Sequence, residues 1–534
     1  MRPAALFSLR DFHQPRRSPV YATDGMAATS HPLATEAAIS TLRGGGNAVD
    51  AAVTAAAVLC VVEPQMVGIG GDCFALVAEP DGSVYGLNGS GRAPAAADAA
   101  RLRAEGFTEI SQDSVHSITV PGAVKAFEAL LKRFGTIGLD RALARAIELA
   151  ENGFPVAPRV AWDWADAVPQ LARHKGGRKH LLVDGRAPAV GDVMRFPALA
   201  ETLRRIAKEG SDGFYRGRVA EDIVATIQAL GGVMDEADLA AVSADWVEPI
   251  GRAYRGLEVM ELPPNGQGAT ALLMLAILER FSFDRLDALG PERFHLEMEA
   301  GRAAYSVRDA EIGDPGHMRT APQALFADAL AEALAAQIDP DRRNPAFAPP
   351  RKVGSDTIYL AVADRDGRLV SLIASLFRAF GTGYVSLETG VTLHSRGGCF
   401  NLEEGHPNGY GPRKRSMHTI IPALARADGL IGAFGVMGAH YQPTGHAHVI
   451  GNLVDFAMDP QTAIEAPRMF FEQDHLSLEG GVPEATADGL AARGHRIVRA
   501  RKPHGGSQMI WIDRERGIIV GASDPRKDGC ALGF

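Results

Sequence analysis

The chain has 534 residues, of which 46% are hydrophobic and 22% charged, an ordinary balance for a globular protein with a large core. Its formal net charge is -9 and its basic residues are scattered, which argues against a nucleic-acid partner. Four cysteines without a Cys-x-x-Cys pair argue against structural zinc and against a disulfide framework.

The N-terminal part of the chain gives no sign of export or membrane insertion. Residues 1–17 lack the apolar core of a signal peptide. The longest near-apolar run, 48–62, is too short to cross a bilayer and is typical of a buried helix. We therefore expect a cytoplasmic protein with no membrane partner.

Two helices, a glycine loop and two strands are predicted next. Helix signals cover 32–43 and 48–62. The loop Gly68-Ile-Gly-Gly-Asp72 leads into a buried strand that ends at residue 78, and another strand covers 83–87. A helix precedes these glycines and a strand follows them, which is the reverse of a nucleotide-binding loop. We expect no nucleotide and no other cofactor.

The middle of the chain, 120–335, is predicted to be mostly helical, with irregular surface structure around short helices at 155–195, which is polar and contains tryptophans. The second half returns to strands with interleaved helices, so the whole favours a layered α/β sandwich. The predicted helices are 123–134, 140–152, 197–209, 219–230, 269–281, 447–456, 462–466 and 484–493, and the later strands are 430–434, 497–499, 509–513 and 518–522.

Thr357 stands at the head of a predicted hairpin. The proline-rich, charged stretch 339–356 excludes a helix or a central strand, and the strands 357–364 and 369–375 follow it. Cleavage before Thr357 would give one residue both a hydroxyl nucleophile and a free α-amino base with a pKa of roughly 7.7–8.0. On this pattern alone, Thr357 is equally well an ordinary threonine that starts a strand.

Other candidate sites give weaker signals. His418 and the cluster His440, His446 and His448 have few carboxylates nearby and no His-Glu-x-x-His pattern, so we expect no metal. A Gly-x-Ser-x-Gly elbow is absent. The turn at 435–439 follows a strand and can aim successive N–H groups at one point, as an oxyanion hole requires, but it is also compatible with a simple glycine turn.

Short motifs occur along the whole chain. They are His31-Pro-Leu-Ala34, 43–52, Val62-Glu-Pro64, 68–71, Gly91-Arg-Ala-Pro94, Pro121-Gly122, Leu262-Pro-Pro264, Asp356-Thr357, Phe380-Gly-Thr-Gly383, Lys414-Arg415, the Gly438 turn and 521–526. In this order, they resemble the γ-glutamyltransferase family of N-terminal-nucleophile hydrolases over about 27–533. The resemblance implies a four-layer αββα sandwich of the α/β (α+β) class. It also implies a large subunit, 1–356, and a small catalytic subunit, 357–534, which together form one domain.

The resemblance also implies catalytic roles. Thr357 matches the processing site and nucleophile, and Ser375 matches a family threonine that would hold the nucleophile by a hydrogen bond. The N–H groups of Gly438 and Ala439 match the paired-glycine oxyanion turn. Alanine at position 439 keeps the N–H group, but its methyl group disfavours the backbone angles that only glycine adopts freely.

The departures from the family concern the substrate. Cys399 replaces an acid that binds the glutamate α-amino group, Phe377 replaces an asparagine, and Arg396 replaces a glutamine. Ser90 stands where the family has the arginine for the α-carboxylate, and the segment 400–414 is too short for the lid loop of the transferases. The substrate-binding candidates are Arg92, Arg396, Cys399, Ser416 and His418, of which Arg92, Arg396 and His418 could hold a carboxylate or belong to structural ion pairs.

The expected function is therefore a self-processing amidohydrolase that cleaves a γ-glutamyl or related carboxyl-bearing amide through an acyl-threonine intermediate. Two alternatives remain, a true γ-glutamyl transferase or glutathione hydrolase, and an unprocessed relative that acts as a binding protein. The expected partners are a small-molecule amide and the two subunits of one precursor. A homodimer of these heterodimers is a further expectation.

Overall fold

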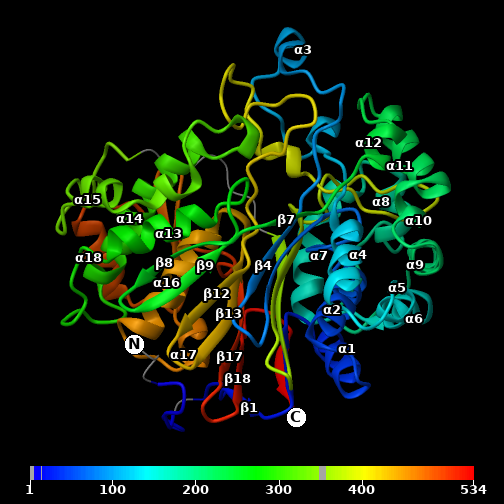
Figure 1. Cartoon of the computed structure of the whole chain (residues 1–534). Coiled ribbons are helices and arrows are strands. Elements are labelled where there is room, and N and C mark those ends of the chain that lie inside the picture. The colour runs from blue at the N-terminus through cyan, green and yellow to red at the C-terminus, as the bar shows by residue number, and fades with distance from the viewer. Residues whose placement is uncertain (1–4, 14, 348–355) are drawn as a thin grey trace.

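The computed structural model describes residues 5–13, 15–347 and 356–534. Two seven-stranded sheets pack face to face, and helices cover both outer faces (Figure 1). The predicted four-layer αββα sandwich is confirmed. Within the described residues, no helix combines the length and the apolar character needed to cross a membrane.

The first sheet carries the hairpin that begins near Thr357. Every neighbouring pair of its strands is antiparallel. The register between the two central strands shifts between Asp356 and Ile358, so Thr357 lies at an irregularity in the ladder. The strand order is β19 (Cys530–Gly533), β2 (Gly25–Thr29), β10 (Asp356–Asp364), β11 (Leu369–Phe377), β3 (Asp72–Ala78), β4 (Val84–Gly89) and β7 (Asp245–Val247).

The second sheet is also antiparallel throughout. Its central strand, β13, ends immediately before Gly438, at the same end of the molecule as the start of β10. The strand order is β1 (Val20–Ala22), β18 (Ile518–Ser523), β17 (Gly506–Asp513), β13 (Leu430–Met437), β12 (Ala423–Ala427), β9 (Leu257–Glu261) and β8 (Ile250–Tyr254).

Apolar side chains of both sheets meet in a buried core between them. Tyr359 of β10 points into this core and its hydroxyl lies 2.8 Å from Ser371 Oγ. Gly435 of β13 faces the Tyr359 ring, where a Cβ atom would lie only 2.4 Å from the ring. Strands β10 and β13, from the two facing sheets, therefore approach each other closely. This brings the residues at their neighbouring ends into one region.

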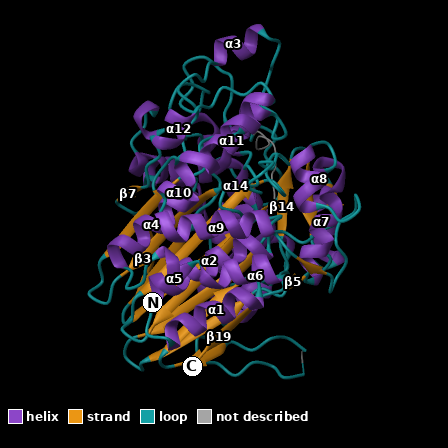
Figure 2. Ribbon diagram, turned by 90° about the vertical axis from the view of Figure 1, so that its right-hand side faces the viewer, coloured by secondary structure: helices purple, strands orange, loops and turns teal. Residues whose placement is uncertain are grey.

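Helices α1 (Pro32–Arg43), α2 (Ala48–Val62), α4 (Ala123–Phe134), α5 (Leu139–Ala142) and α6 (Ala144–Asn152) cover the first sheet (Figure 2). Every residue of α2 is buried, which explains its continuous apolar sequence. Helices α13 (Gly268–Leu278), α14 (Pro291–Glu311) and α16 (Gln442–Val454) cover the second sheet.

The remaining elements surround this sandwich. They are α3 (Ala99–Ala104), α7 (Pro158–Leu171), α8 (Lys175–Leu181), α9 (Pro197–Glu209), α10 (Asp212–Tyr215), α11 (Gly217–Ala229), α12 (Glu236–Ala240), α15 (Asp328–Ala335), α17 (Pro460–Glu465), α18 (Glu484–Ala492), β5 (Phe154–Pro155), β6 (Val193–Met194), β14 (Met469–Glu472), β15 (His475–Leu478) and β16 (Ile497–Arg499). Short 3₁₀ helices lie at 115–117, 315–317, 322–326, 396–399 and 439–441.

Several predicted elements differ from the structure. The helix predicted at 140–152 is two helices, α5 and α6. The irregular segment predicted at 155–195 contains the fourteen-residue helix α7, which tolerates Pro169 in its last turn. The middle of the chain also supplies β7, β8 and β9, although it was predicted to be mostly helical.

Candidate active site

Thr357 and Ser375 lie side by side on β10 and β11. Thr357 is 1% exposed, and its Oγ1 atom lies 3.1 Å from Ser375 Oγ. Ser375 Oγ also accepts a hydrogen bond of 2.8 Å from the N–H group of Phe377, which fixes its orientation. The structure thus places together the two hydroxyls that the sequence pointed to. The proline-rich residues 348–355 before them lie outside the described residues.

The glycine loop at 68–71 allows its backbone to pack closely against the backbone of β11. A Cβ atom on Gly71 would lie 2.4 Å from the carbonyl oxygen of Ser375, so only glycine fits there. The loop delivers Asp72, the first residue of β3, to the position directly across the ladder from Ser375. Glycine at this point therefore puts a carboxylate beside the two hydroxyls.

The carboxylate of Asp72 is fully buried and has three basic neighbours. His418 Nε2 lies 2.9 Å from its Oδ2 atom, His394 Nδ1 lies 3.3 Å away and Arg396 Nε lies 3.8 Å away. Burial opposes ionisation, but His394 and His418 outweigh it and hold the pKa of Asp72 well below its ordinary value. Burial, together with the charge of Arg396, lowers the pKa of His418 to about 3. His418 is therefore a neutral donor to an ionised Asp72.

Arg396 lies just behind the wall of the site. Its Nη1 atom donates to Thr419 Oγ1 over 2.7 Å, and its guanidinium group stacks 4.3 Å from the centre of the Phe377 ring. Its Nε and Nη2 atoms are buried and have no hydrogen-bond partner among the described residues. A buried cation with spare N–H groups favours a nearby anion.

A turn follows β13 on the opposite sheet. Gly438 has φ of +121° and Ala439 has φ of +47°, so Ala439 adopts the left-handed conformation in spite of its methyl group. Gln267 Nε2 donates to the Ala439 carbonyl oxygen over 2.9 Å and holds the turn in place. Within the described part of the chain, neither the Gly438 nor the Ala439 N–H group donates to a backbone acceptor. Such a turn can offer two N–H groups to an oxyanion.

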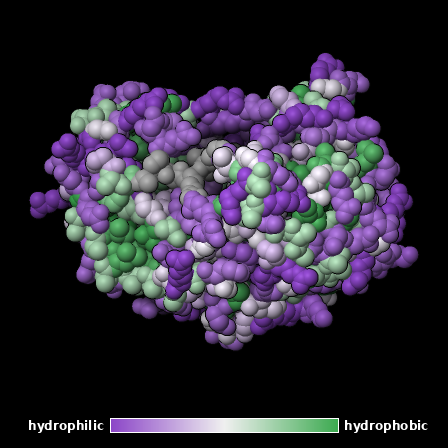
Figure 3. Space-filling model, turned by 90° about the horizontal axis from the view of Figure 1, so that it is seen from above, coloured by the Kyte–Doolittle hydropathy of each residue, from purple (hydrophilic) through white to green (hydrophobic). Residues whose placement is uncertain are grey.

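A cavity of about 1150 Å³ opens beside these elements. Phe377, Cys399 and His440 line it, so it reaches the residues next to Ser375 and to the Gly438 turn. The other lining residues are Arg103, 107–112, Arg308, Asp309, Ile312, Arg378, Gly398, 400–403, Asn408, Met417, Glu472, Gln473 and His475. The molecule is shown from above in Figure 3, where its surface is largely hydrophilic.

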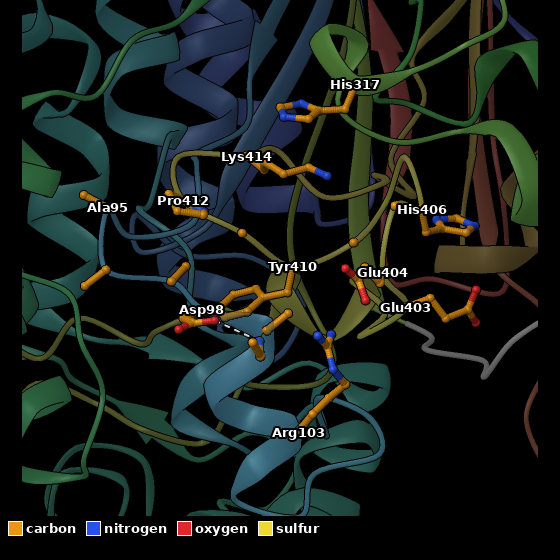
Figure 4. Close-up of a pocket in the computed structure, with 17 residues that line it drawn as sticks. Ala95, Asp98, Arg103, His317, Glu403, Glu404, His406, Tyr410, Pro412 and Lys414 are labelled. Carbon is orange, nitrogen blue, oxygen red and sulfur yellow. Dashed lines mark hydrogen bonds between the residues drawn. The ribbon is translucent and has the colours of Figure 1, made fainter.

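A second, more open cavity of about 630 Å³ adjoins the first (Figure 4). Arg103 of α3 and Glu403 line both cavities. Tyr410 and Lys414, from the short segment 400–414, lie around this second cavity in the close-up. The short loop therefore leaves an open approach to the site.

The structure does not bring all five substrate-binding candidates together. Cys399 lines the main cavity, with its Sγ atom 3.9 Å from Arg396 Nη1. Ser416 is buried and its Oγ lies 3.4 Å from the Arg396 carbonyl oxygen. The Nε2 atom of His418 is already hydrogen-bonded to Asp72. The Arg92 side chain is 41% exposed, forms ion pairs with Asp245 and Asp314, and borders a separate cavity of about 320 Å³.

Sequence reasoning missed four residues of this region. Asp72 was considered only as the end of a glycine loop, and His440 only as a metal ligand. Arg308 and Gln267 carried no motif, because their proximity to the Gly438 turn arises from packing of α13 and α14 against the second sheet. No group of three or more His, Cys, Asp or Glu side chains is arranged to hold a metal ion within 5–13, 15–347 and 356–534.

The sequence was then compared with known proteins. The family model for Gamma-glutamyltranspeptidase matches residues 34–534. The chain belongs to this family. It is therefore an enzyme of the hydrolase and transpeptidase type, with the N-terminal-nucleophile hydrolase fold. The resemblance on which the sequence reasoning rested is confirmed.

Individual relatives match along nearly their whole length. The glutathione hydrolase-like YwrD proenzyme of Bacillus subtilis is 36% identical over 527 residues, covering 96% of this chain and 99% of the relative. The oxamate amidohydrolase proenzyme of Klebsiella pneumoniae is 34% identical, with 96% and 99% covered. The crystal structure of cephalosporin acylase from Bacillus halodurans superposes with a TM-score of 0.91, 37% identity and 99% of both chains covered. Relatives named as proenzymes and amidohydrolases agree with a self-processing amidohydrolase of gamma-glutamyltranspeptidase type.

Proposed function

We propose that this family member cuts itself between Asp356 and Thr357 and then hydrolyses a carboxyl-bearing amide through an acyl-threonine intermediate. The observation that carries the proposal is the pair of buried hydroxyls, 3.1 Å apart, of Thr357 at the start of β10 and Ser375 near the end of β11. Both are placed by backbone pairing and not by flexible loops. A release assay across γ-glutamyl amides, oxamate and glutaryl amides tests it, and no turnover of any of them by the processed enzyme would contradict it.

The proposed mechanism uses the chain's own groups. After cleavage, the α-amino group of Thr357 takes the proton from Oγ1, which attacks the amide carbonyl carbon. The carbonyl oxygen becomes an oxyanion that the N–H groups of Gly438 and Ala439 stabilise. The ammonium then gives its proton to the leaving nitrogen and the C–N bond breaks. Water, activated by the same amine, attacks the ester, releases the acid and restores the hydroxyl. Ser375 orients Oγ1 throughout.

Hydrolysis is proposed over transfer because the approach is open and the loop at 401–414 is short. The relative named oxamate amidohydrolase supports an amide whose acyl part carries a carboxylate, and the structure named cephalosporin acylase supports amide hydrolysis. Arg396 supports the same class, since its buried Nη2 atom lies behind the cavity wall without a hydrogen-bond partner among the described residues. Cytoplasmic location and a homodimer of the processed heterodimers remain part of the proposal. All four cysteines are free, which supports the cytoplasmic location.

Activity should depend on pH through the Thr357 amine. The unprotonated amine is the base, so kcat/KM should fall about tenfold per pH unit below the amine pKa of roughly 7.7–8.0. Asp72 and His418 do not titrate there, because their pKa values lie well below this range. A pH profile of amide release checks this, and constant activity from pH 8 to pH 5 would exclude the amine as the base.

Cys399→Asp should shift preference towards γ-glutamyl substrates. Burial raises the pKa of the Cys399 thiol, so the wild-type residue is neutral and cannot pair with a substrate ammonium group. A carboxylate there would add a charge-assisted hydrogen bond, worth about 1.5–3 kcal/mol or roughly tenfold or more in binding. The ratio of kcat/KM for γ-glutamyl over glutaryl p-nitroanilide measures this. Cys399→Asn is the neutral control, and an unchanged ratio in the aspartate variant would show that another residue meets the amine.

A further inference from the structure

His440 follows directly after the Gly438–Ala439 turn and borders the main cavity. Its side chain is only 4% exposed, and its backbone carbonyl oxygen accepts a hydrogen bond from the Tyr305 hydroxyl. The ring of Phe377 meets its imidazole edge-on, with the ring centres 6.1 Å apart. The imidazole is thus held between the turn and the cavity wall, close to the proposed acyl site.

The contacts of His440 determine where its proton lies. Arg308 Nη1 is 3.1 Å from His440 Nδ1, and arginine only donates hydrogen bonds, so Nδ1 must accept. Burial, with the charges of Arg308 and Arg396, holds the pKa of His440 well below its ordinary value, so the ring is neutral. The single ring proton therefore sits on Nε2. No described residue accepts a hydrogen bond from that atom, which leaves it available to a ligand.

Arg308 is itself anchored. Its Nη1 atom also donates to Gln267 Oε1 over 2.9 Å, and its Nε atom donates to Asp309 over 2.8 Å. Gln267 is the residue that holds the Ala439 carbonyl oxygen. The imidazole orientation and the oxyanion turn consequently share one rigid support.

This end of the cavity favours an anion. Arg308 and Arg396 both place positive charge near His440, with Asp72 3.8 Å from Arg396 Nε on the far side, and Cys399 supplies no negative charge. Asp309, the nearest carboxylate on this wall, is paired with Arg308. The other acidic side chains of the lining are on separate segments of the cavity wall, and they are Glu109, Glu403 and Glu472.

We propose that His440 is a specificity-determining residue whose neutral Nε2–H group donates a hydrogen bond to the carboxylate of the substrate's acyl group. The inference rests on the proposed function. Arg308 fixes the ring, and Arg308 with Arg396 supplies the positive potential that draws the carboxylate to this end of the cavity. The carboxylate site then lies beside the oxyanion turn, and not at Ser90, where the family holds its arginine.

Three p-nitroanilide substrates test which groups of the acyl part the enzyme recognises. The γ-glutamyl probe carries an amine and a carboxylate, the glutaryl probe only the carboxylate, and the butyryl probe neither. Wild type should prefer the glutaryl over the butyryl probe by about tenfold or more in kcat/KM, because a hydrogen bond to a charged group is worth that much. Absence of this preference overturns the proposal whatever the variants do.

Two substitutions distinguish the two faces of the ring. His440→Asn keeps an acceptor near the Nδ1 position for Arg308 but loses the donor at Nε2, whereas His440→Gln keeps a donor near Nε2. We expect the asparagine variant to raise KM for the glutaryl probe about tenfold or more, with the butyryl probe little changed, and the glutamine variant to regain part of the preference. His13→Asn, at an exposed histidine outside the cavity lining, is the matched control and should behave as wild type.

The outcomes separate the possible failures. Equal loss of kcat on all three probes in both variants would make His440 a support of the turn and overturn the specificity role. The reverse order, with asparagine active and glutamine impaired, would show that only the Arg308 contact matters. A processed wild type that releases no p-nitroaniline from any probe would instead contradict the proposed function. Intact mass and thermal unfolding confirm that each variant is folded.

Discussion

Thr357→Ala should remain one chain of 534 residues and should have no amidase activity, whereas the wild type should separate into 1–356 and 357–534. The reason is chemical, since Oγ1 must attack the carbonyl carbon of residue 356 to give an ester that water then cleaves. The same oxygen later attacks the substrate. Alanine removes both steps at once but leaves the strand β10 and its pairing with β11 unchanged. Intact mass and an amide-release assay measure the two effects.

Thr357→Ser provides the matched control. It keeps the hydroxyl and should cleave itself and turn over substrate, although more slowly if the methyl group helps to orient Oγ1. Thr23→Ala, at an exposed threonine far along the chain, should be processed as the wild type is. If purified wild type is an uncleaved chain with full activity, Thr357 is not an N-terminal nucleophile and the mechanism is wrong.

Elements with a strong local signal were predicted from the sequence. The helices at 32–43 and 48–62 agree with α1 and α2 to the residue, because Gly44 and the Asn47 capping box mark their ends clearly. The hairpin after residue 356 has β-branched strands and an Asp-Gly turn, and it is present as β10 and β11. These signals act over a few residues, so one sequence is enough to detect them.

Elements that depend on tertiary packing were not predicted. Helix α14 was missed because it is buried almost all round and carries several buried charged residues, among them Arg293 and Arg308, which hides the apolar period. The length of helix α7 was missed because its polar, tryptophan-bearing sequence suggested irregular structure around short helices. In both helices, partners elsewhere in the chain outweigh the local preference.

The candidate active site shows the same difference between residues in local motifs and residues brought together by tertiary packing. The resemblance identified Thr357, Ser375 and the Gly438 turn because these positions carry motifs. The place of Asp72 beside Ser375 depends on the pairing of β3 with β11, about 300 residues apart in sequence, and no local pattern encodes it. Arg92 was a reasonable candidate for binding a substrate carboxylate, but its guanidinium group forms ion pairs with Asp245 and Asp314. Charge alone did not distinguish a binding arginine from one in a structural ion pair.

The oxyanion turn offers a second large effect. Gly438→Ala should lower kcat about 100- to 1000-fold, the usual cost of losing one oxyanion donor. Gly438 has φ of +121°, which an L-residue rarely adopts, and a Cβ atom there would lie 3.1 Å from the Gly505 Cα atom. The backbone must rotate, and the N–H groups of Gly438 and Ala439 then leave their common direction. Single-turnover kinetics would locate the loss in formation of the acyl-enzyme.

Ala439→Gly is the matched control for this turn. Its φ of +47° suits glycine at least as well as alanine, and glycine keeps the N–H group. We expect kcat close to that of the wild type, because glycine keeps both the N–H donor and the backbone conformation of the turn. If Gly438→Ala retains full kcat while Ala439→Gly loses it, the oxyanion is held elsewhere. If both retain it, the turn has no catalytic part, and the donors must be sought among the side chains of the cavity, with His440 the first to test.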